Sequence, residues 1–279
     1  MTLSRKLQEP DPEVIRRAAA GDSDALYALL RALQDPIFGL AVRMLRHRAD
    51  AEDATQEALL RIVTHLGQFR SESRFSTWAW RIAVNRILDR SRDRAGEVPT
   101  AFEAMREDLE AGRDPHAPER AEDAVLLREL KVQCSRAMLQ CLGPDERIAF
   151  TLGDVLNLSS EEAAEVLGIE RAAFRKRVSR ARAALQQFLS SECGVYNPAA
   201  PCRCHRRLSR ALELGRVTPG ALEVSEGGLP EVRQHLAAIG EARRVTAFFR
   251  SDPSARSRRD LVDALRRQLG RLGVPEVKA

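Results

Sequence analysis

The strongest chemical signal in the sequence is a run of basic residues on a helix that follows a short capped helix. Ser159 and Glu162 have the S-x-x-E spacing of a capping box, which predicts a helix that begins at Ser160. Gly168 supplies a turn residue, and a second helix is expected from Arg171. The basic residues of this second helix are Arg171, Arg175, Lys176, Arg177, Arg180 and Arg182. A capped helix, a glycine turn and a basic amphipathic helix are typical of a helix-turn-helix.

This basic helix predicts contact with duplex DNA. The second helix of a helix-turn-helix lies in the major groove, where arginine pairs with guanine acceptors and neutralises phosphates. A solvated helix face usually mixes charges of both signs, whereas no acid stands between Arg171 and Arg182. We therefore favour DNA binding over a merely solvated face.

A second cluster joins large rings to basic residues in the stretch "FSTWAWRIAVNRILDR", residues 75–90. Both tryptophans of the chain, Trp78 and Trp80, stand here. Two interpretations remain open for each ring. Trp78 packs in the core or forms part of a binding surface, and Trp80 braces the helix from inside or takes part in that surface.

Near the C-terminus the sequence offers a candidate metal site. Cys193, Cys202, Cys204 and His205 form the pattern C-x8-C-x-C-H, whose soft ligands suit zinc or copper(I). The spacing is not that of a standard zinc knuckle, and adjacent Cys and His rarely bind one ion together. Plain reduced thiols in a structural loop are the alternative, and redox sensing is another. The bases that would lower the pKa of these thiols are Arg203, Arg206 and Arg207.

Helices must position all of these residues, since apolar residues recur at helical spacing almost everywhere and no stretch alternates like a strand. We predict an all-α protein of two small helical domains joined by a flexible linker, with a helical C-terminal extension. The predicted boundaries are 10–94 for the first domain, 95–123 for the linker, 124–190 for the helix-turn-helix domain and 191–279 for the extension.

Local signals predict where several helices begin. Residues 24–45 form one or two helices around Pro36, and Asp50 is expected to cap the next helix. Ser76 is expected to cap the tryptophan helix, and Pro144 to open another. In the extension, helices are predicted at 230–250 and 257–269, and this pair is expected to pack on one of the domains or on a partner.

Composition limits the function further. The 279 residues carry a net charge of +5, which permits a polyanionic partner. Five cysteines fit a reducing compartment, and we expect no signal peptide and no apolar run as long as a membrane span. The sequence has no P-loop, no G-x-G-x-x-G and no H-E-x-x-H, and its histidines share no pattern. A cytoplasmic, non-enzymatic protein without a required cofactor or a membrane partner is expected.

Taken together, the motifs resemble the extracytoplasmic-function (ECF) sigma factors of the sigma-70 superfamily. The resemblance covers about residues 10–190, and the quoted matches are "DAEDATQEALLRIV", "FR" at 69–70, "FSTWAWRIAVNRILDRSR", "LSSEEAAEVLGI" and "RVSRARAAL". It implies a subunit that directs core RNA polymerase to promoters and helps to open them. Recruitment of an anti-sigma factor is a further expectation of this resemblance.

The resemblance also assigns roles to residues. It implies that the helix-turn-helix binds the minus-thirty-five element and that the first domain captures an unstacked base of the minus-ten strand. The minus-ten candidates are Phe69, Arg70, Arg74, Phe75, Trp78, Asn85 and Arg86, of which Asn85 matches the family asparagine near the flipped base. The candidates for docking on the clamp helices of the largest polymerase subunit are Asp50, Asp53, Gln56, Glu57 and Arg61.

The sequence departs from the family pattern in two places. The recognition helix begins "RAAFRKRV", where relatives carry small or hydroxylated residues, so the minus-thirty-five preference stays open. The extension 191–279 lies outside the minimal family, and we expect it to regulate the rest. The alternative function is a stand-alone helix-turn-helix regulator, which would explain 159–188 but not the acidic and tryptophan-bearing helices before it.

Overall fold

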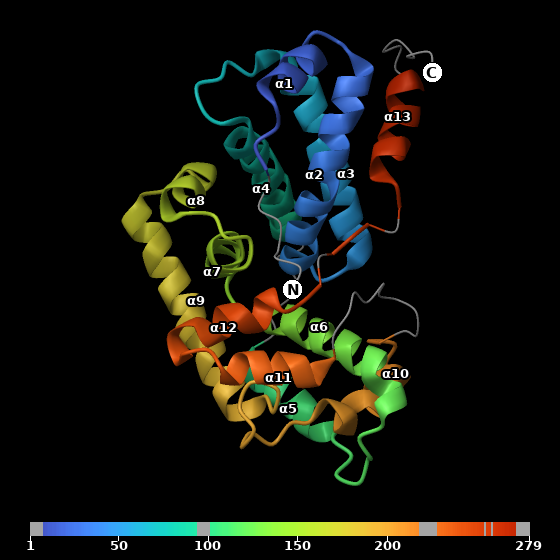
Figure 1. Cartoon of the computed structure of the whole chain (residues 1–279), viewed down its shortest axis with the longest axis vertical. Helices are drawn as coiled ribbons and strands as arrows, with labels where there is room; N and C mark the ends of the chain where they lie inside the picture. Colours follow the sequence, from blue (N-terminus) through green and yellow to red (C-terminus); the bar gives the residue numbers. More distant parts are fainter. Residues whose placement is uncertain (1–7, 94–100, 218–227, 254, 258, 272–279) are drawn as a thin grey trace. The chain divides into compact units, whose positions relative to one another are not determined.

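The computed structural model describes residues 8–93, 101–217, 228–253, 255–257 and 259–271. Throughout these residues the regular structure is helical, apart from one isolated β-bridge between Cys193 and Cys202. The all-α prediction is confirmed. The chain forms two compact units, which we call the α2 unit and the α6 unit after a helix in each (Figure 1). The α2 unit contains the described residues of Arg5–Glu97, Thr151–Arg175 and Ser254–Ala279, and the α6 unit contains those of Val98–Phe150 and Lys176–Pro253.

In the α2 unit, three long helices pack side by side around an apolar core (Figure 1). The centre is α2, whose inward residues include Leu30, Leu33 and Ile37, all fully buried. It is a single helix that continues through Pro36. The helices of this unit are α1 (Pro12–Ala19), α2 (Ser23–Met44), α3 (Arg48–His65), α4 (Phe75–Asp93), α8 (Ser160–Leu167) and α13 (Leu261–Arg271), with short turns at η1 (Leu66–Gln68) and η3 (Thr151–Val155).

Helix α2 is long and apolar enough to cross a membrane by length and composition, with a mean hydropathy of 1.3 over its best window. The expectation that no apolar run reaches this length is therefore wrong. More than half of that window is buried inside the structure, and α2 contacts α1, α3, α4 and α13. Burial of this kind is typical of the core helix of a globular unit, which must be apolar on most of its faces.

Two predicted helix starts are wrong. Helix α3 begins at Arg48 with His47 at the N-cap, so Asp50 lies in the first turn and does not cap the helix. Helix α4 begins at Phe75, and the carboxylate of Glu9 accepts the amide protons of Phe75 at 2.7 Å and Ser76 at 3.1 Å. A distant acid therefore supplies the first-turn acceptor that the sequence assigned to Ser76.

Helix α13 covers part of the α2–α3 surface of its unit (Figure 1). Its side chains Leu261, Val262 and Leu265 are almost fully buried. The amide Oε1 of Gln34 accepts the backbone N–H groups of Leu261 at 2.9 Å and Val262 at 3.1 Å, so α2 supplies the first-turn acceptor of α13. The predicted final helix thus exists, shifted to Leu261–Arg271.

In the α6 unit, the helices of the extension pack against α6. Contacts join α6 to α10, to α11 and to the η4 turn. The expected pair does not pack together on one domain, because α11 and α12 belong to the α6 unit whereas α13 packs on α2 and α3 of the α2 unit. The predicted helix 230–250 is also split in two before Glu241. The elements of this unit are α5 (Phe102–Ala111), η2 (Ala121–Asp123), α6 (Ala124–Gln140), α7 (Pro144–Phe150), η4 (Cys204–Arg207), α10 (Leu208–Glu213), α11 (Leu229–Ala237) and α12 (Glu241–Arg250).

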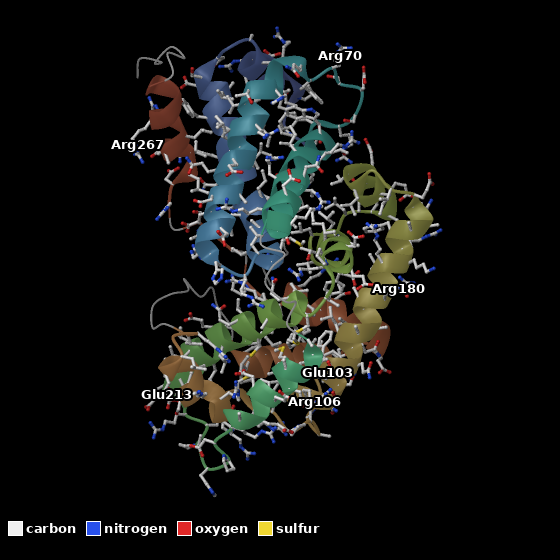
Figure 2. All side chains as sticks on the ribbon, turned by 180° about the vertical axis from the view of Figure 1, so that it is seen from behind. Arg70, Glu103, Arg106, Arg180, Glu213 and Arg267 are labelled. Carbon is white, nitrogen blue, oxygen red and sulfur yellow. The ribbon has the colours of Figure 1, made fainter. Side chains whose placement is uncertain are left out.

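The predicted linker is not devoid of structure, because it contains the ten-residue helix α5. Met105 and Leu109 of this helix are buried, and the Phe102 ring lies 5.0 Å from that of Phe188. Arg106, which is labelled in Figure 2, donates to Glu192 at 2.8 Å. The sequence pattern did not predict this helix. The segment is rich in proline and acidic residues, and an apolar face of two or three residues gives little helical periodicity.

Candidate nucleic-acid interface

The helix-turn-helix forms as the sequence predicts. Ser159 caps α8, with its Oγ accepting the N–H of Glu162 at 3.2 Å while Glu162 accepts the N–H of Ser159 at 2.8 Å. Gly168 ends α8 in the left-handed conformation, at φ 63° and ψ 36°, where a side chain would be strained. Helix α9 (Arg171–Glu192) follows after two residues. Both the capping box and the start at Arg171 are confirmed.

The basic residues of α9 divide into two groups. Arg175, Lys176 and Arg180 are exposed, and among the described residues none forms an ion pair with them. Figure 2 shows Arg180 projecting from α9. We call these three residues the groove face. At 100° per residue, Lys176 and Arg180 lie on the side of α9 opposite the apolar stripe of Phe174, Val178, Ala181 and Leu185.

The other three bases of α9 are less available than the sequence suggested. Arg177 is half-buried and pairs with Asp145 at 2.8 Å, and Arg182 is also half-buried. Both flank the apolar stripe at helical spacing, which explains their burial. Arg171 is exposed but pairs with Glu161 at 2.6 Å. An exposed pair of this kind contributes little stability, so Arg171 can exchange Glu161 for another anion.

Beside the start of α4, three aromatic rings form one cluster. The ring centroids of Phe69 and Trp78 lie 5.4 Å apart, those of Phe75 and Trp78 5.5 Å, and those of Phe69 and Phe75 5.4 Å. Phe75 is only 1% exposed, so its ring supports the other two from inside and offers no surface to a partner. Trp80 is a core residue at 2% exposure. Phe69 and Trp78 are half-buried and keep part of their surface.

Polar and basic residues lie on the same loop and helix as these two accessible rings. Arg70 is exposed on the loop before α4 (Figure 2), and Asn85 is exposed on α4 itself. Arg86 is half-buried and donates to Asp89. We call Phe69, Arg70, Trp78, Asn85 and Arg86 the strand surface. It combines rings that can stack on a base, an amide that can pair with its edge, and cations that can hold phosphates.

Two arginines, one just before α4 and one within it, already contact α8 inside the α2 unit. Arg74 donates to Glu162 at 2.7 Å and lies 3.6 Å from Glu9. Arg81 donates to the carbonyl of Glu165 at 3.0 Å. The sequence assigned Arg74 to the minus-ten strand, but it could not reveal these acidic partners, which lie far away along the chain.

On α3, an acidic ridge faces outward. Asp53, Glu57 and Arg61 are exposed and stand four residues apart, and Gln56 beside them is half-buried. We call these four residues the docking ridge. Asp50 does not belong to it, because it is only 4% exposed and its carboxylate lies 3.4 Å from Arg90. Arg90 also contacts Asp53 at 3.3 Å, so it fastens α4 to α3.

The candidate metal set is not brought together as predicted. The ring Nδ1 of His205 lies 3.7 Å from Glu119, and burial lowers the pKa of this imidazole. Cys193, Cys202 and Cys204 are half-buried residues, and burial raises the pKa of each thiol. Within the part of the chain that the structure describes, no three Cys, His, Asp or Glu side chains stand arranged around a common metal position.

Comparison with known proteins identifies the family. Sigma-70 region 2 matches residues 29–97, and sigma-70 region 4 matches residues 133–185. The RNA polymerase sigma-H factor of Pseudomonas aeruginosa is 34% identical over 188 residues, which cover 65% of this chain and 95% of that protein. The ECF RNA polymerase sigma factor SigW of Bacillus subtilis is 31% identical over 181 residues, or 63% of this chain and 94% of that protein.

The chain therefore belongs to the extracytoplasmic-function sigma factors of the sigma-70 family. It is an RNA polymerase sigma factor that acts in transcription initiation at promoters. A solved structure of the sigma factor RpoE with the anti-sigma factor NepR from Bartonella quintana aligns at a TM-score of 0.41 and 21% identity, over 60% of this chain and 96% of that chain. A likeness at this level supports no argument about this chain. Neither family model reaches residues 186–279.

Proposed function

We propose that this sigma factor reads promoters with two surfaces and binds core RNA polymerase with a third. The strand surface captures an unstacked base of the minus-ten element, the groove face binds the minus-thirty-five duplex, and the docking ridge contacts the clamp helices of the largest polymerase subunit. The observation that carries the proposal is the presence of all three surfaces on one chain, since a stand-alone regulator needs only the groove face.

The strand surface is suited to single-stranded DNA. A base leaves the duplex at a cost of a few kcal/mol, which stacking against a protein ring offsets by about 1–3 kcal/mol per base. Phe69 and Trp78 retain surface for such stacking, while the fully buried Phe75 fixes their orientation from below. The exposed Asn85 side chain offers both a donor and an acceptor to the edge of the base.

The docking ridge is suited to a basic partner helix. Its two carboxylates and Arg61 form an ordered charge pattern along one ridge of α3, and such patterns determine partner choice and register more than raw affinity. An acidic ridge also repels DNA, which separates this surface from the other two. We further propose that the protein acts in the cytoplasm, catalyses no chemistry of its own, and needs no cofactor for promoter recognition.

We propose a regulatory role for the extension, alone or together with an anti-sigma factor. Two observations support it. Helices α11 and α12 belong to the α6 unit, and α13 covers part of α2 and α3 in the α2 unit. Arg259, before α13, lies 3.4 Å from Glu52 of α3, one residue from the docking ridge.

In vitro transcription tests the proposed function. Core polymerase is supplied with a promoter library, with and without this protein, and start sites that depend on the protein are mapped. The charge-reversal variant Asp53→Lys with Glu57→Lys is expected to abolish these start sites and binding to core polymerase. Glu213→Lys is the matched control, since Glu213 is an exposed acid on α10 of the other unit (Figure 2).

The opposite result would favour the alternative function. If no start site depends on the protein, while it binds a specific duplex tightly without polymerase, the chain is a stand-alone helix-turn-helix regulator. In that case the Arg175→Ala and Arg180→Ala variants would still weaken duplex binding, whereas the docking-ridge variant would leave it unchanged.

A further inference from the structure

The last described helix, α13, is held on α2 by polar contacts in addition to its buried apolar face. Arg31 of α2 donates to Asp260 at 3.2 Å and to Asp263 at 3.0 Å. One turn further along α13, the guanidinium of Arg266 lies 5.2 Å from the centre of the Tyr27 ring. We call the described residues of 255–271, which contain α13, the strap. Contacts at successive turns thus hold the strap on the α2 unit.

The strap also covers an acid of α3. Glu52 is only 7% exposed, and its carboxylate lies 3.2 Å from Arg48 of the same helix and 3.4 Å from Arg259 of the strap. Arg48 in turn donates to the Arg256 carbonyl at 2.8 Å. The strap therefore supplies one of the two cations that Glu52 contacts. Sequence reasoning did not single out Glu52, because its partner in the strap lies far away along the chain.

Glu52 borders the docking ridge. Asp53 is the next residue of α3, and Gln56 lies one turn after Glu52 on the same flank of the helix. A helix with its side chains is about 10–12 Å wide and packs with its axis about 8–10 Å from that of its partner. Because α13 already packs on α3, a partner helix laid along the ridge would meet the strap.

The outward charge of the strap opposes a basic partner. The Arg259 side chain is 71% exposed, and Arg266 and Arg267 are exposed on α13. Figure 2 shows Arg267 projecting from this helix. The two acids of the strap already pair with α2. Like charges brought together across an interface are unfavourable, so a basic helix that approaches the docking ridge would be repelled here.

We propose that the strap is an autoinhibitory segment, which competes with the clamp helices of core polymerase for the acidic side of α3. This proposal rests on the docking ridge of the proposed function. In the closed form the strap covers Glu52 and occupies the space beside the ridge. In the open form the strap leaves, and Glu52 joins Asp53 and Glu57 in a wider acidic surface that core polymerase binds.

The contacts of the strap are weak enough to be broken by a competing partner. The side chains of Arg31, Asp260 and Asp263 are 59%, 41% and 46% exposed, and ion pairs as exposed as these contribute little to stability. The apolar face of α13 has only three buried side chains. Helices as short as its eleven residues are marginally stable in water, so α13 should unfold when it leaves α2 and α3.

The affinity of the full-length chain for core polymerase tests the proposal. Leu265→Asp places a charge in the apolar contact and should release the strap. We expect it to lower the dissociation constant about tenfold, the factor for a strap that is closed in about nine molecules of ten. Gln34→Ala removes the first-turn acceptor of α13 and should act in the same direction, by less. Leu212→Asp is the matched control, since Leu212 is an exposed leucine on α10 of the other unit.

A peptide of residues 255–271 extends this test. Added to the Leu265→Asp chain, it should weaken polymerase binding again, whereas the same peptide carrying Leu265→Asp should not. Tryptophan fluorescence of α4 checks that each variant keeps a folded α2 unit. Hydrogen exchange of the unaltered chain gives a readout that needs no variant. The amides of α13 should exchange slowly in the free protein and rapidly once core polymerase binds.

Two results would overturn the proposal while the proposed function stands. They are unchanged polymerase binding by both the Leu265→Asp and Gln34→Ala variants, and α13 amides that stay protected in the complex. In either case the strap only stabilises the α2 unit. Normal polymerase binding by Asp53→Lys with Glu57→Lys is a different result, which would contradict the docking ridge itself and with it the competition at α3.

Discussion

At the scale of single residues, the buried ammonium group of Lys131 holds the extension against α6. Its Nζ lies 2.6 Å from Asp252 and also donates to the Phe248 carbonyl and the Ser251 hydroxyl. Lys131 is 1% exposed, and burial lowers the pKa of its ammonium group. The ring of Phe248 lies 4.1 Å from the same nitrogen. Groups at the end of α12 and directly after it therefore surround the charge of the Lys131 ammonium group.

Removal of this ammonium group should destabilise the protein strongly. Lys131→Met leaves the Asp252 carboxylate buried without its cation, which typically costs about 3–5 kcal/mol of the free energy of unfolding. Urea denaturation measures the loss. Lys131→Met combined with Asp252→Leu should recover most of it, since no charge then remains buried. As a control, Arg210→Ala breaks an exposed pair with Glu213 and should change stability by at most about 1 kcal/mol.

The buried thiols of Cys134 and Cys202 predict how stability depends on pH in the reduced protein. Burial raises the pKa of Cys134 to about 12 and that of Cys202 to about 11, from an ordinary value of 9.0. The unfolded chain therefore loses thiol protons above pH 9.0 while the folded chain keeps them. The contribution of these thiols to the free energy of unfolding is fully present below pH 9.0. It decreases as the pH rises towards the folded pKa values.

Unfolding by urea at a series of pH values measures this effect. We expect a slope of about 1.4 kcal/mol per pH unit for each thiol that stays protonated only in the folded state. Cys134→Ser should reduce the slope, whereas Cys141→Ser should not. A free energy of unfolding that stays flat from pH 9.0 to pH 11 would show that these thiols are not enclosed.

At the scale of elements, α4 shows how a helix end depends on a distant segment. The carboxylate of Glu9 accepts the first two amide protons of α4, and Arg74 joins it from the same turn. Negative charge at a helix N-terminus is favourable because the unpaired N–H groups point towards it. The N-terminal segment thus fixes the start of the helix that carries Trp78 and Asn85.

Glu9→Ala should therefore destabilise the α2 unit by about 1 kcal/mol, the usual effect of losing a helix cap. Chemical denaturation followed by tryptophan fluorescence reports on this unit, because both tryptophans lie on α4. Glu13→Ala is the control, since the exposed Glu13 pairs with the exposed Arg16 within α1. Equal effects of the two substitutions would contradict the capping role.

Substitutions of the two tryptophans of α4 should have different effects, one mainly on stability and the other mainly on promoter opening. Trp80→Ala removes a ring that is 2% exposed and should cost about 3–5 kcal/mol of stability. Trp78→Ala removes a half-buried ring of the strand surface, so it should cost less stability but slow promoter opening in transcription assays. Normal opening by a well-folded Trp78→Ala variant would remove this ring from the strand surface.

At the scale of the whole molecule, the extension is part of the folded structure and not an appendage. Its elements contact α6, whose residues Leu130, Lys131 and Val132 are buried, and the Phe249 ring lies 5.2 Å from that of Phe150. Sigma region 4 therefore shares its core with residues that lie beyond the family match.

A chain that ends at Ser190 should therefore have a less stable α6 unit. This loss of stability would mask any regulatory effect of removing the extension. We expect this truncated chain to show reduced helix content and to melt at a lower temperature by circular dichroism. A regulatory role is better tested with Arg259→Ala, which removes the contact of an exposed arginine with the buried Glu52 and changes no apolar core residue. A truncated chain that retains the helix content expected for residues 1–190 would contradict the shared core.

The sequence by itself determined what local rules govern. Capping, turn and periodicity signals act within a few residues, so they fixed the capping box of Ser159, the turn at Gly168, the helix from Arg171 and the all-α class. The family motifs likewise identified a sigma factor. These features need no knowledge of distant contacts.

Only the tertiary structure decided which side chains meet across the chain. It buried Phe75 and Asp50, paired Arg74 with Glu162, and placed the His205 ring beside Glu119. It also supplied the cap of α4 from Glu9 and the partner of Lys131 from Asp252. The physical reason is that burial and pairing depend on packing between segments far apart in sequence, and no local pattern encodes such neighbours.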